Sequence, residues 1–210
     1  MNMGHLPRVK ICGITQLKDA LLAAEFGASM VGFIFWPRSP RFIDPYHAQE
    51  IVSSLPPWLS PVGVFVDQSF EHVCSVASLV KLGAVQLHGN EGTEYCEKLP
   101  HRVIKAMQIT KDRLDEVGRT PSSVTLLLDN HDPVWIGGTG RTIDWSAAAK
   151  ISRRRKIILS GGLCPENVVE AIKKVRPCGV DVASGVEERP GVKDADRLEK
   201  FFKAVHEADT

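Results

Sequence analysis

The stretch "KIILSGGLCPENVVEAIKKVRPCGVDVAS", residues 156–184, contains one complete structural repeat of this chain. It begins with a short aliphatic run (156–160), turns at two glycines, continues as an amphipathic segment (164–175) and ends in a second apolar run (179–184). Apolar residues of the middle segment recur at helical spacing, and Pro165 lies where proline often begins a helix. The pattern therefore predicts a strand, a helix and a second strand parallel to the first.

The same unit recurs along the chain at intervals of about 25 residues, with amphipathic segments such as 17–27 and 69–83 between strand-like runs. The runs are RVKIC (8–12), MVGFIF (30–35), PVGVFV (61–66), AVQLH (84–88), RVIKAM (102–107), SVTLLLD (123–129), KIILS (156–160) and GVDVAS (179–184). Eight strand and helix units with right-handed crossovers close naturally into a barrel. We therefore predict an α/β fold, a single (β/α)8 TIM barrel domain over residues 1–210. An open doubly wound sheet is the alternative, because counting strands does not prove closure. A short or irregular fifth helix is expected within 108–122.

Composition narrows the possible roles of the chain. It has 210 residues, 43% hydrophobic and 24% charged, which suits one globular domain. A net charge of +1 does not indicate a surface that binds nucleic acid or an anionic membrane. The basic run 153–156 is expected to be a solvated loop.

No stretch has the roughly 18 apolar residues that a membrane span needs, and the first residues lack the hydrophobic core of a signal peptide. A cytoplasmic protein is therefore expected. Five cysteines without a C-x-x-C pair favour reduced thiols and no structural zinc.

Polar residues gather near the carboxyl ends of the predicted strands, where barrels of this type carry their active sites. Successive strand residues face opposite sides, which predicts one set that faces the barrel interior. This set is Lys10, Cys12, Gln86, His88, Lys105, Met107, Leu127, Asp129, Asp181 and Ala183. The apolar neighbours expected to face the helices are Val9, Ile11, Val85, Leu87, Ile104, Ala106, Leu126, Leu128, Val180 and Val182. Because unpaired buried polar groups are costly, the interior set predicts a polar ligand or a hydrogen-bonded network, and we favour the ligand.

Two glycine-containing turns follow the seventh and eighth strands, at 160–167 and 183–191. Loops at these positions form the recurrent phosphate site of this fold, because glycine lets main-chain N–H groups approach the anion closely. The predicted phosphate contacts are Gly161, Gly162, Ser184 and Gly185.

Seven segments, taken in order, resemble the signatures of the phosphoribosylanthranilate isomerase family of tryptophan biosynthesis. They are KICGIT, GFIFWPRSPR, QLHG, LLLD, GGTGRTIDW, LSGGLCPENV and GVDVASGVE, between about residues 8 and 191. The resemblance implies an Amadori rearrangement of N-(5-phosphoribosyl)anthranilate, an aminoaldose, to the aminoketose 1-(2-carboxyphenylamino)-1-deoxyribulose 5-phosphate. It implies no cofactor and no metal, a small phosphosugar substrate, and a monomer or homodimer.

The resemblance also implies roles for particular residues. Asp129 is the expected general acid, which protonates the furanose ring oxygen, and Cys12 is the expected general base, which removes the C2 proton. A carboxyl pKa near 4 and a thiol pKa near 8.5 suit neither role at neutral pH without a shift. Lys10 can lower the thiol pKa, and the apolar strand around Asp129 can raise the carboxyl pKa by desolvation.

Three further side chains are implied in substrate binding. Arg41 is expected to pair with the anthranilate carboxylate, which suits its planar guanidinium. His88 and Asp181 are expected to line the site and touch ribosyl hydroxyls, with a satisfied structural network as the alternative for both. The segment GGTGR (137–141) lacks the Walker pattern and is expected to shape a mobile loop over the substrate.

Three other functions remain as alternatives. The sister isomerase of histidine biosynthesis carries an aspartate in place of Cys12 and a second phosphate cradle, which the early turns CGIT and VDQSF lack. A Schiff-base aldolase would need a desolvated Lys105 facing a carbonyl. A barrel that binds phosphate without catalysis is disfavoured because both Cys12 and Asp129 are retained.

Overall fold

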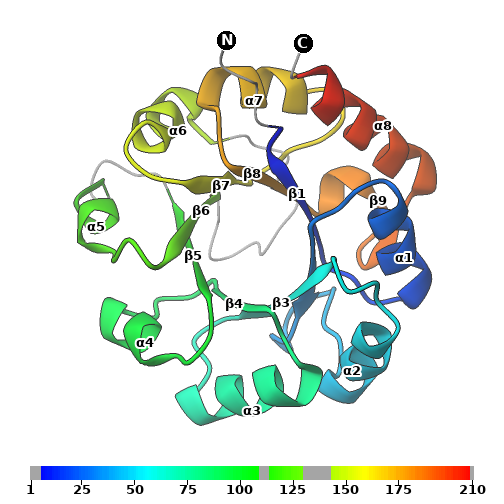
Figure 1. The fold of residues 1–210 in the computed structure, drawn as a ribbon, viewed down its shortest axis with the longest axis vertical. Coiled ribbons are helices and arrows are strands. Elements are labelled where there is room, and N and C mark those ends of the chain that lie inside the picture. The colour runs from blue at the N-terminus through cyan, green and yellow to red at the C-terminus, as the bar shows by residue number, and fades with distance from the viewer. Residues whose placement is uncertain (1–5, 109–113, 130–142, 209–210) are drawn as a thin grey trace.

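Eight parallel strands close into a barrel in the computed structural model, which describes residues 6–108, 114–129 and 143–208. Each strand pairs with the next along the chain, and β8 pairs back with β1, so the ring has no open edge (Figure 1). The strands are β1 (Arg8–Cys12), β2 (Met30–Ile34), β3 (Ser60–Phe65), β4 (Ala84–Leu87), β5 (Val103–Gln108), β6 (Thr125–Asp129), β7 (Ile157–Leu159) and β8 (Gly179–Val182). The predicted (β/α)8 barrel is confirmed, and the open sheet is wrong.

Helices alternate with the strands and form an outer ring around them (Figure 1). They are α1 (Leu17–Glu25), α2 (Pro45–Ser53), α3 (Phe70–Val80), α4 (Thr93–Lys98), α5 (Leu114–Arg119), α6 (Trp145–Ser152), α7 (Val168–Val175) and α8 (Ala195–Glu207). The short fifth helix is confirmed, since α5 has 6 residues. None of the helices in the described ranges has the length and apolar character needed to cross a lipid bilayer.

Side-chain caps start four of these helices. Asp44 accepts hydrogen bonds from the main chain at the start of α2, and Ser69, Asp144 and Asp194 do the same for α3, α6 and α8. Each cap satisfies main-chain donors that have no partner within the helix.

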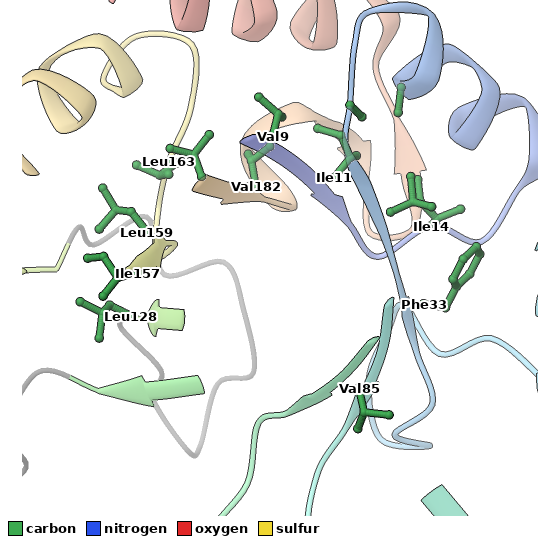
Figure 2. Packing of buried hydrophobic residues seen from close by; sticks show 14 of the residues in the cluster. Val9, Ile11, Ile14, Phe33, Val85, Leu128, Ile157, Leu159, Leu163 and Val182 are labelled. Atoms are coloured by element: carbon green, nitrogen blue, oxygen red, sulfur yellow. The ribbon is translucent and has the colours of Figure 1, made fainter. Parts of the chain in front are cut away.

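The core has two layers. The larger layer fills the space between the strands and the helices, and Figure 2 shows Val9, Ile11 and Leu159 among its members. The smaller layer fills the interior of the barrel with Val62, Ala84, Ile104, Ala106, Leu127 and Ile158. Strand alternation explains this division, because adjacent residues of one strand contribute to different layers.

The prediction of which side chains face inward is wrong for the fifth strand. Ile104 and Ala106 belong to the inner layer, whereas Met107 belongs to the outer layer. Ala106 pairs with the inward Leu127, so Lys105 has the outward orientation of Met107. The prediction is wrong because both faces of this strand carry apolar residues, so the polar residue inside it does not mark the inward face.

A short hairpin after β8 was not predicted. The 3₁₀ turn η2 (Ser184–Val186) leads into β9 (Glu187–Arg189), which pairs antiparallel with β10 (Val192–Lys193) before α8 begins. Gly191 connects the two strands with a φ of 81°, a conformation that favours glycine. Strands of three and two residues are too short to give a clear alternating pattern in the sequence.

One residue of the basic run 153–156 is not simply solvated. Its neighbours are exposed, but Arg155 is half-buried and donates hydrogen bonds to the carbonyl oxygens of Val117, Thr120, Pro121 and Val124, at 2.6 to 3.1 Å. The first of these carbonyls belongs to α5, and the other three belong to the connection between α5 and β6. Arg155 therefore anchors the segment that leads into the strand of Asp129.

Replacing this arginine is expected to destabilise the protein. Arg155→Met leaves four main-chain acceptors without their charged donor, so the free energy of unfolding should fall by about 1–2 kcal/mol. The matched control is Arg154→Met, whose exposed side chain should change stability by less than about 0.5 kcal/mol. Urea denaturation of both variants measures the difference, and equal stabilities would contradict the anchoring role of Arg155.

Candidate active site

The predicted base lies where the barrel closes. Cys12 ends β1, and Lys10 of the same strand pairs with Asp181 of β8 in the parallel ladder. The Lys10 Nζ donates to Asp181 Oδ1 at 2.8 Å, and Ser160 Oγ lies 3.4 Å from Asp181 Oδ2. The Lys10 side chain is fully buried. Asp181 was predicted to touch ribosyl hydroxyls. In the structure its carboxylate forms a buried ion pair with Lys10.

Gly32 makes room for this pair and for the thiol. It lies opposite Cys12 in the β1–β2 ladder, and a Cβ atom at Gly32 would lie 2.7 Å from Cys12 Sγ and 3.2 Å from Lys10 Nζ. Any larger residue would displace both groups. Gly32 was not predicted as a site residue, because a glycine inside an apolar strand gives no indication of which side chains it faces.

The charge state of the thiol depends on opposing effects. Burial raises the pKa of the Cys12 thiol, the Lys10 ammonium lowers it, and the Asp181 carboxylate raises it again. The net direction is upward, so Lys10 lowers the thiol pKa as predicted but does not outweigh burial. Burial alone would lower the pKa of Lys10, but Asp181 and Cys12 reverse this and raise it, which keeps Lys10 charged.

The predicted acid lies in a second polar group, at the ends of β4 and β6. Asp129 Oδ2 lies 3.3 Å from His88 Nε2, and His88 Nδ1 lies 2.9 Å from Gln86 Nε2. The two ring nitrogens of His88 therefore lie against Gln86 and Asp129, and these two contacts fix the orientation of the ring. His88 therefore orients the Asp129 carboxylate, which keeps about a fifth of its side-chain surface exposed.

Arg41 is not a surface residue. It is buried, and its Nε and Nη2 donate to both carboxylate oxygens of Glu187 at 2.7 to 3.0 Å. The side chain passes over Gly13, whose φ of 77° favours glycine and where a Cβ atom would lie 2.6 Å from Arg41 Cδ. Glu187 was missed by the sequence analysis, because it lies in the unpredicted hairpin.

The two predicted phosphate loops lie against each other. Gly161 and Gly162 have φ values of 83° and 69°, so this turn needs glycine at both positions. A Cβ atom at Gly185 would collide with the main chain of Leu163, which brings the loop of Ser184 close to the loop after β7. Asn167 holds the first loop, since its side chain accepts from Cys164 N and donates to Gly162 O, both at 2.9 Å.

Other candidates from the sequence are placed as follows. Lys105 Nζ donates to Glu91 Oε2 and to Gly89 O, both at 2.7 Å, on the outer side of β5. A lysine that faces outward and donates two hydrogen bonds is not placed to act as a Schiff-base nucleophile.

The segment 137–141 lies outside the described residues. All five cysteines are free thiols, and within the described ranges no group of three or more His, Cys, Asp or Glu side chains is arranged to hold a metal ion.

Polar groups that converge at the carboxyl ends of the strands of a closed barrel are the mark of a (β/α)8-barrel enzyme. The sequence model of the N-(5'-phosphoribosyl)anthranilate isomerase family matches residues 9–204. The N-(5'-phosphoribosyl)anthranilate isomerase of Thermotoga maritima is 49% identical over 199 residues, which cover 93% of this chain and 97% of that protein. The same enzyme of Trichlorobacter lovleyi is 46% identical over 203 residues, 96% of this chain and 98% of that protein.

Solved structures agree with these relatives. A phosphoribosylanthranilate isomerase from Thermotoga maritima matches with a TM-score of 0.89 and 48% identity, over 96% of this chain and 99% of that one. A second isomerase structure, in complex with reduced 1-(o-carboxyphenylamino)-1-deoxyribulose 5-phosphate, matches with a TM-score of 0.85 and 46% identity over the same shares. A third structure, of monomers generated from the dimeric Thermotoga maritima isomerase, matches with a TM-score of 0.85 and 44% identity, also over 96% and 99% of the two chains. The chain belongs to the N-(5'-phosphoribosyl)anthranilate isomerase family.

Removing the ammonium beside Cys12 is expected to disfavour the thiolate further. In Lys10→Met the nearest positive charge is lost and Asp181 is left without its cation, so the thiol pKa should rise further. Ultraviolet titration of the thiolate, with the same titration of Cys12→Ser subtracted, gives the value. Lys18→Met, which changes an exposed lysine on α1, is the control and should leave the pKa unchanged. A pKa that stays constant in Lys10→Met would remove Lys10 from any role in tuning the base.

Proposed function

We propose that this chain rearranges N-(5'-phosphoribosyl)anthranilate to 1-(2-carboxyphenylamino)-1-deoxyribulose 5-phosphate by general acid–base catalysis, with Asp129 as the acid and Cys12 as the base. The isomerase activity and its place in tryptophan biosynthesis follow from family membership. The assignment of roles rests on one observation. A buried thiol next to an ammonium ends β1, and a partly exposed carboxylate ends β6 on the same rim of the barrel.

The reaction needs two proton transfers at different atoms of the sugar. An acid protonates the furanose ring oxygen, which opens the ring to a Schiff base, and a base then removes the C2 proton to give an enolamine. The enolamine becomes the aminoketose by tautomerisation. Cys12 and Asp129 lie on strands separated by β7 and β8, so a sugar placed between them meets the two groups from different directions.

The surroundings of the two groups support these roles. The thiolate that Cys12 needs as a base is favoured by Lys10 and by Lys193, which both lower the thiol pKa against the effect of burial. His88 lies against the carboxyl group of Asp129, and Gln86 holds the His88 ring in place from its other side. Because neighbouring side chains hold both catalytic groups in place, little conformational entropy is lost when the substrate reaches the reactive geometry.

Substrate binding is proposed at two positions. The glycine turns after β7 and β8 would receive the phosphate, since both offer main-chain N–H groups and lie close together. Arg41 would bind the anthranilate carboxylate through Nη1, which donates to no residue in the described part of the chain.

The protein is expected to be a homodimer, like the dimeric relative, or a monomer. The cytoplasmic location and the absence of a cofactor or metal remain predictions.

Loss of substrate fluorescence tests the proposed reaction directly. The wild-type protein should consume freshly made phosphoribosylanthranilate rapidly, whereas Cys12→Ser and Asp129→Asn should lower kcat by about 100-fold or more. KM should change far less, because both groups act in the transition state. Cys74→Ser, a cysteine on α3 outside the site, serves as the control with wild-type kcat.

The result has three readings. No turnover by any of the proteins would contradict the proposed substrate, and the histidine-pathway substrate would be tried next. Wild-type kcat in one variant would remove that residue from its catalytic role while leaving the reaction in place. Equal loss in the Cys74 control would show that the cysteine effect is structural.

Arg41→Ala should act mainly on binding. Loss of a charged hydrogen bond to the substrate carboxylate should raise KM by about tenfold or more, with a smaller change in kcat. The matched control is Arg38→Ala, which removes an exposed arginine from the same loop and should keep the wild-type KM. Steady-state kinetics of both variants, with circular dichroism as a check of folding, makes the comparison. An unaltered KM in Arg41→Ala would exclude Arg41 from substrate binding.

A further inference from the structure

The hairpin after β8 carries a buried carboxylate whose hydrogen-bonding capacity is fully used. Glu187 accepts three hydrogen bonds from Arg41, one from Lys193 Nζ at 2.8 Å and one from the main-chain N–H of Gly191 at 3.2 Å. Burial would raise the pKa of Glu187, but Arg41 and Lys193 together hold it below its ordinary value. Glu187 is therefore an anion that is fixed in position by two cations.

Lys193 extends this group to the catalytic strand. Its side chain is fully buried, and its Nζ donates to the carbonyl oxygens of Cys12 and Ala183 as well as to Glu187. All three ammonium protons thus have an acceptor. The main-chain N–H of Lys193 donates to the buried carboxylate of Asp19 at 2.9 Å, which fixes the hairpin against α1. Lys193 therefore couples the position of Glu187 to the main chain of Cys12.

The same contacts divide the guanidinium of Arg41 into two edges. Glu187 occupies the edge formed by Nε and Nη2, and the edge that contains Nη1 has no acceptor among the described residues. A guanidinium can bind one carboxylate at each edge, because its five N–H donors form two forks. Gly13, next to Cys12, lies directly under the Arg41 side chain. The open edge is thus held at a fixed place relative to the thiol.

The buried charges of this region are all engaged. The cations are Arg41, Lys10 and Lys193, and the anions are Glu187, Asp181 and Asp19. Each of the three carboxylates accepts a hydrogen bond from one of these cationic residues, through its side chain or its main-chain N–H. Since removing one partner leaves the other charge buried without compensation, these contacts hold the side chains in place.

We propose that Glu187 and Lys193 are positioning residues, which hold Arg41 with its Nη1 edge toward the substrate carboxylate and fix that edge relative to the main chain of Cys12. This inference rests on the proposed function, since it concerns how Arg41 selects a substrate with a ring carboxylate. Glu187 acts through Arg41 and does not touch the substrate. It therefore determines specificity for the carboxylate and not binding strength in general.

The test compares two ligands that differ only in that carboxylate. One is reduced 1-(o-carboxyphenylamino)-1-deoxyribulose 5-phosphate, and the other is the same compound without the ring carboxylate. Calorimetry of the wild-type protein should give a Kd about tenfold or more lower for the first ligand. In Glu187→Gln this preference should shrink to less than about threefold, because the affinity for the first ligand falls and the affinity for the second is retained. Glu188→Gln, the exposed neighbour with the same charge change, should keep the wild-type preference.

Two further variants keep the test decisive. If Glu187→Gln does not fold, Glu187→Gln combined with Lys193→Met removes one charge of each sign and should show the same loss of preference. In an Arg41→Met background, Glu187→Gln should have no additional effect on the preference, because Glu187 then has no guanidinium to hold. An additional loss in that background would overturn the inference.

Other outcomes also separate the possibilities. Equal weakening of both ligands would mean a structural role only, and an unchanged preference in Glu187→Gln would exclude any role in selection. A wild-type protein that isomerises phosphoribosylanthranilate but does not prefer the carboxylated ligand overturns this inference alone. A wild-type protein without isomerase activity overturns the proposed function.

Discussion

The pairing of β8 with β1 is the constraint on which the site depends. It closes the barrel, and it also aligns Lys10 with Asp181, which form an ion pair at 2.8 Å across the closure. Residues from the two ends of the chain meet there, since Cys12 and Arg41 come from the first quarter and Glu187 and Lys193 from the last. A barrel that failed to close would leave these charges exposed and separated, so folding and assembly of the site are one event.

The buried charges around Cys12 influence whether its thiol can lose a proton. Desolvation raises the thiol pKa of Cys12, and the same low-polarity surroundings strengthen the attraction between the thiolate and its neighbouring cations. The net effect is a raised thiol pKa, and the cations limit how far burial raises it. The second group, at β4 and β6, works by orientation instead, because Gln86 and His88 set the direction of Asp129.

The residues that face the barrel interior could be predicted for some strands and not for others. Where polar and apolar residues alternate clearly, as in β1, β4 and β8, the inward residues were predicted correctly. In β5 both faces are apolar apart from Lys105 and the terminal Gln108, and the prediction placed Lys105 on the wrong side. Arg41 was found from the family signature, but Glu187, which holds it, lies 146 positions further along the chain and gave no local signal.

The repeating strand and helix units, their number, the glycine turns after the last two strands and the family can all be predicted from the amino-acid sequence alone. These are local patterns, set by hydrophobic periodicity and by backbone conformations that only glycine adopts readily. The pairing of polar groups is visible only in the folded barrel, where Lys10 pairs with Asp181, Arg41 with Glu187 and Asp129 with His88. The interaction between two charges depends on the distance between them in space. The closed barrel brings together residues that are far apart in the sequence, so that distance cannot be deduced from the sequence.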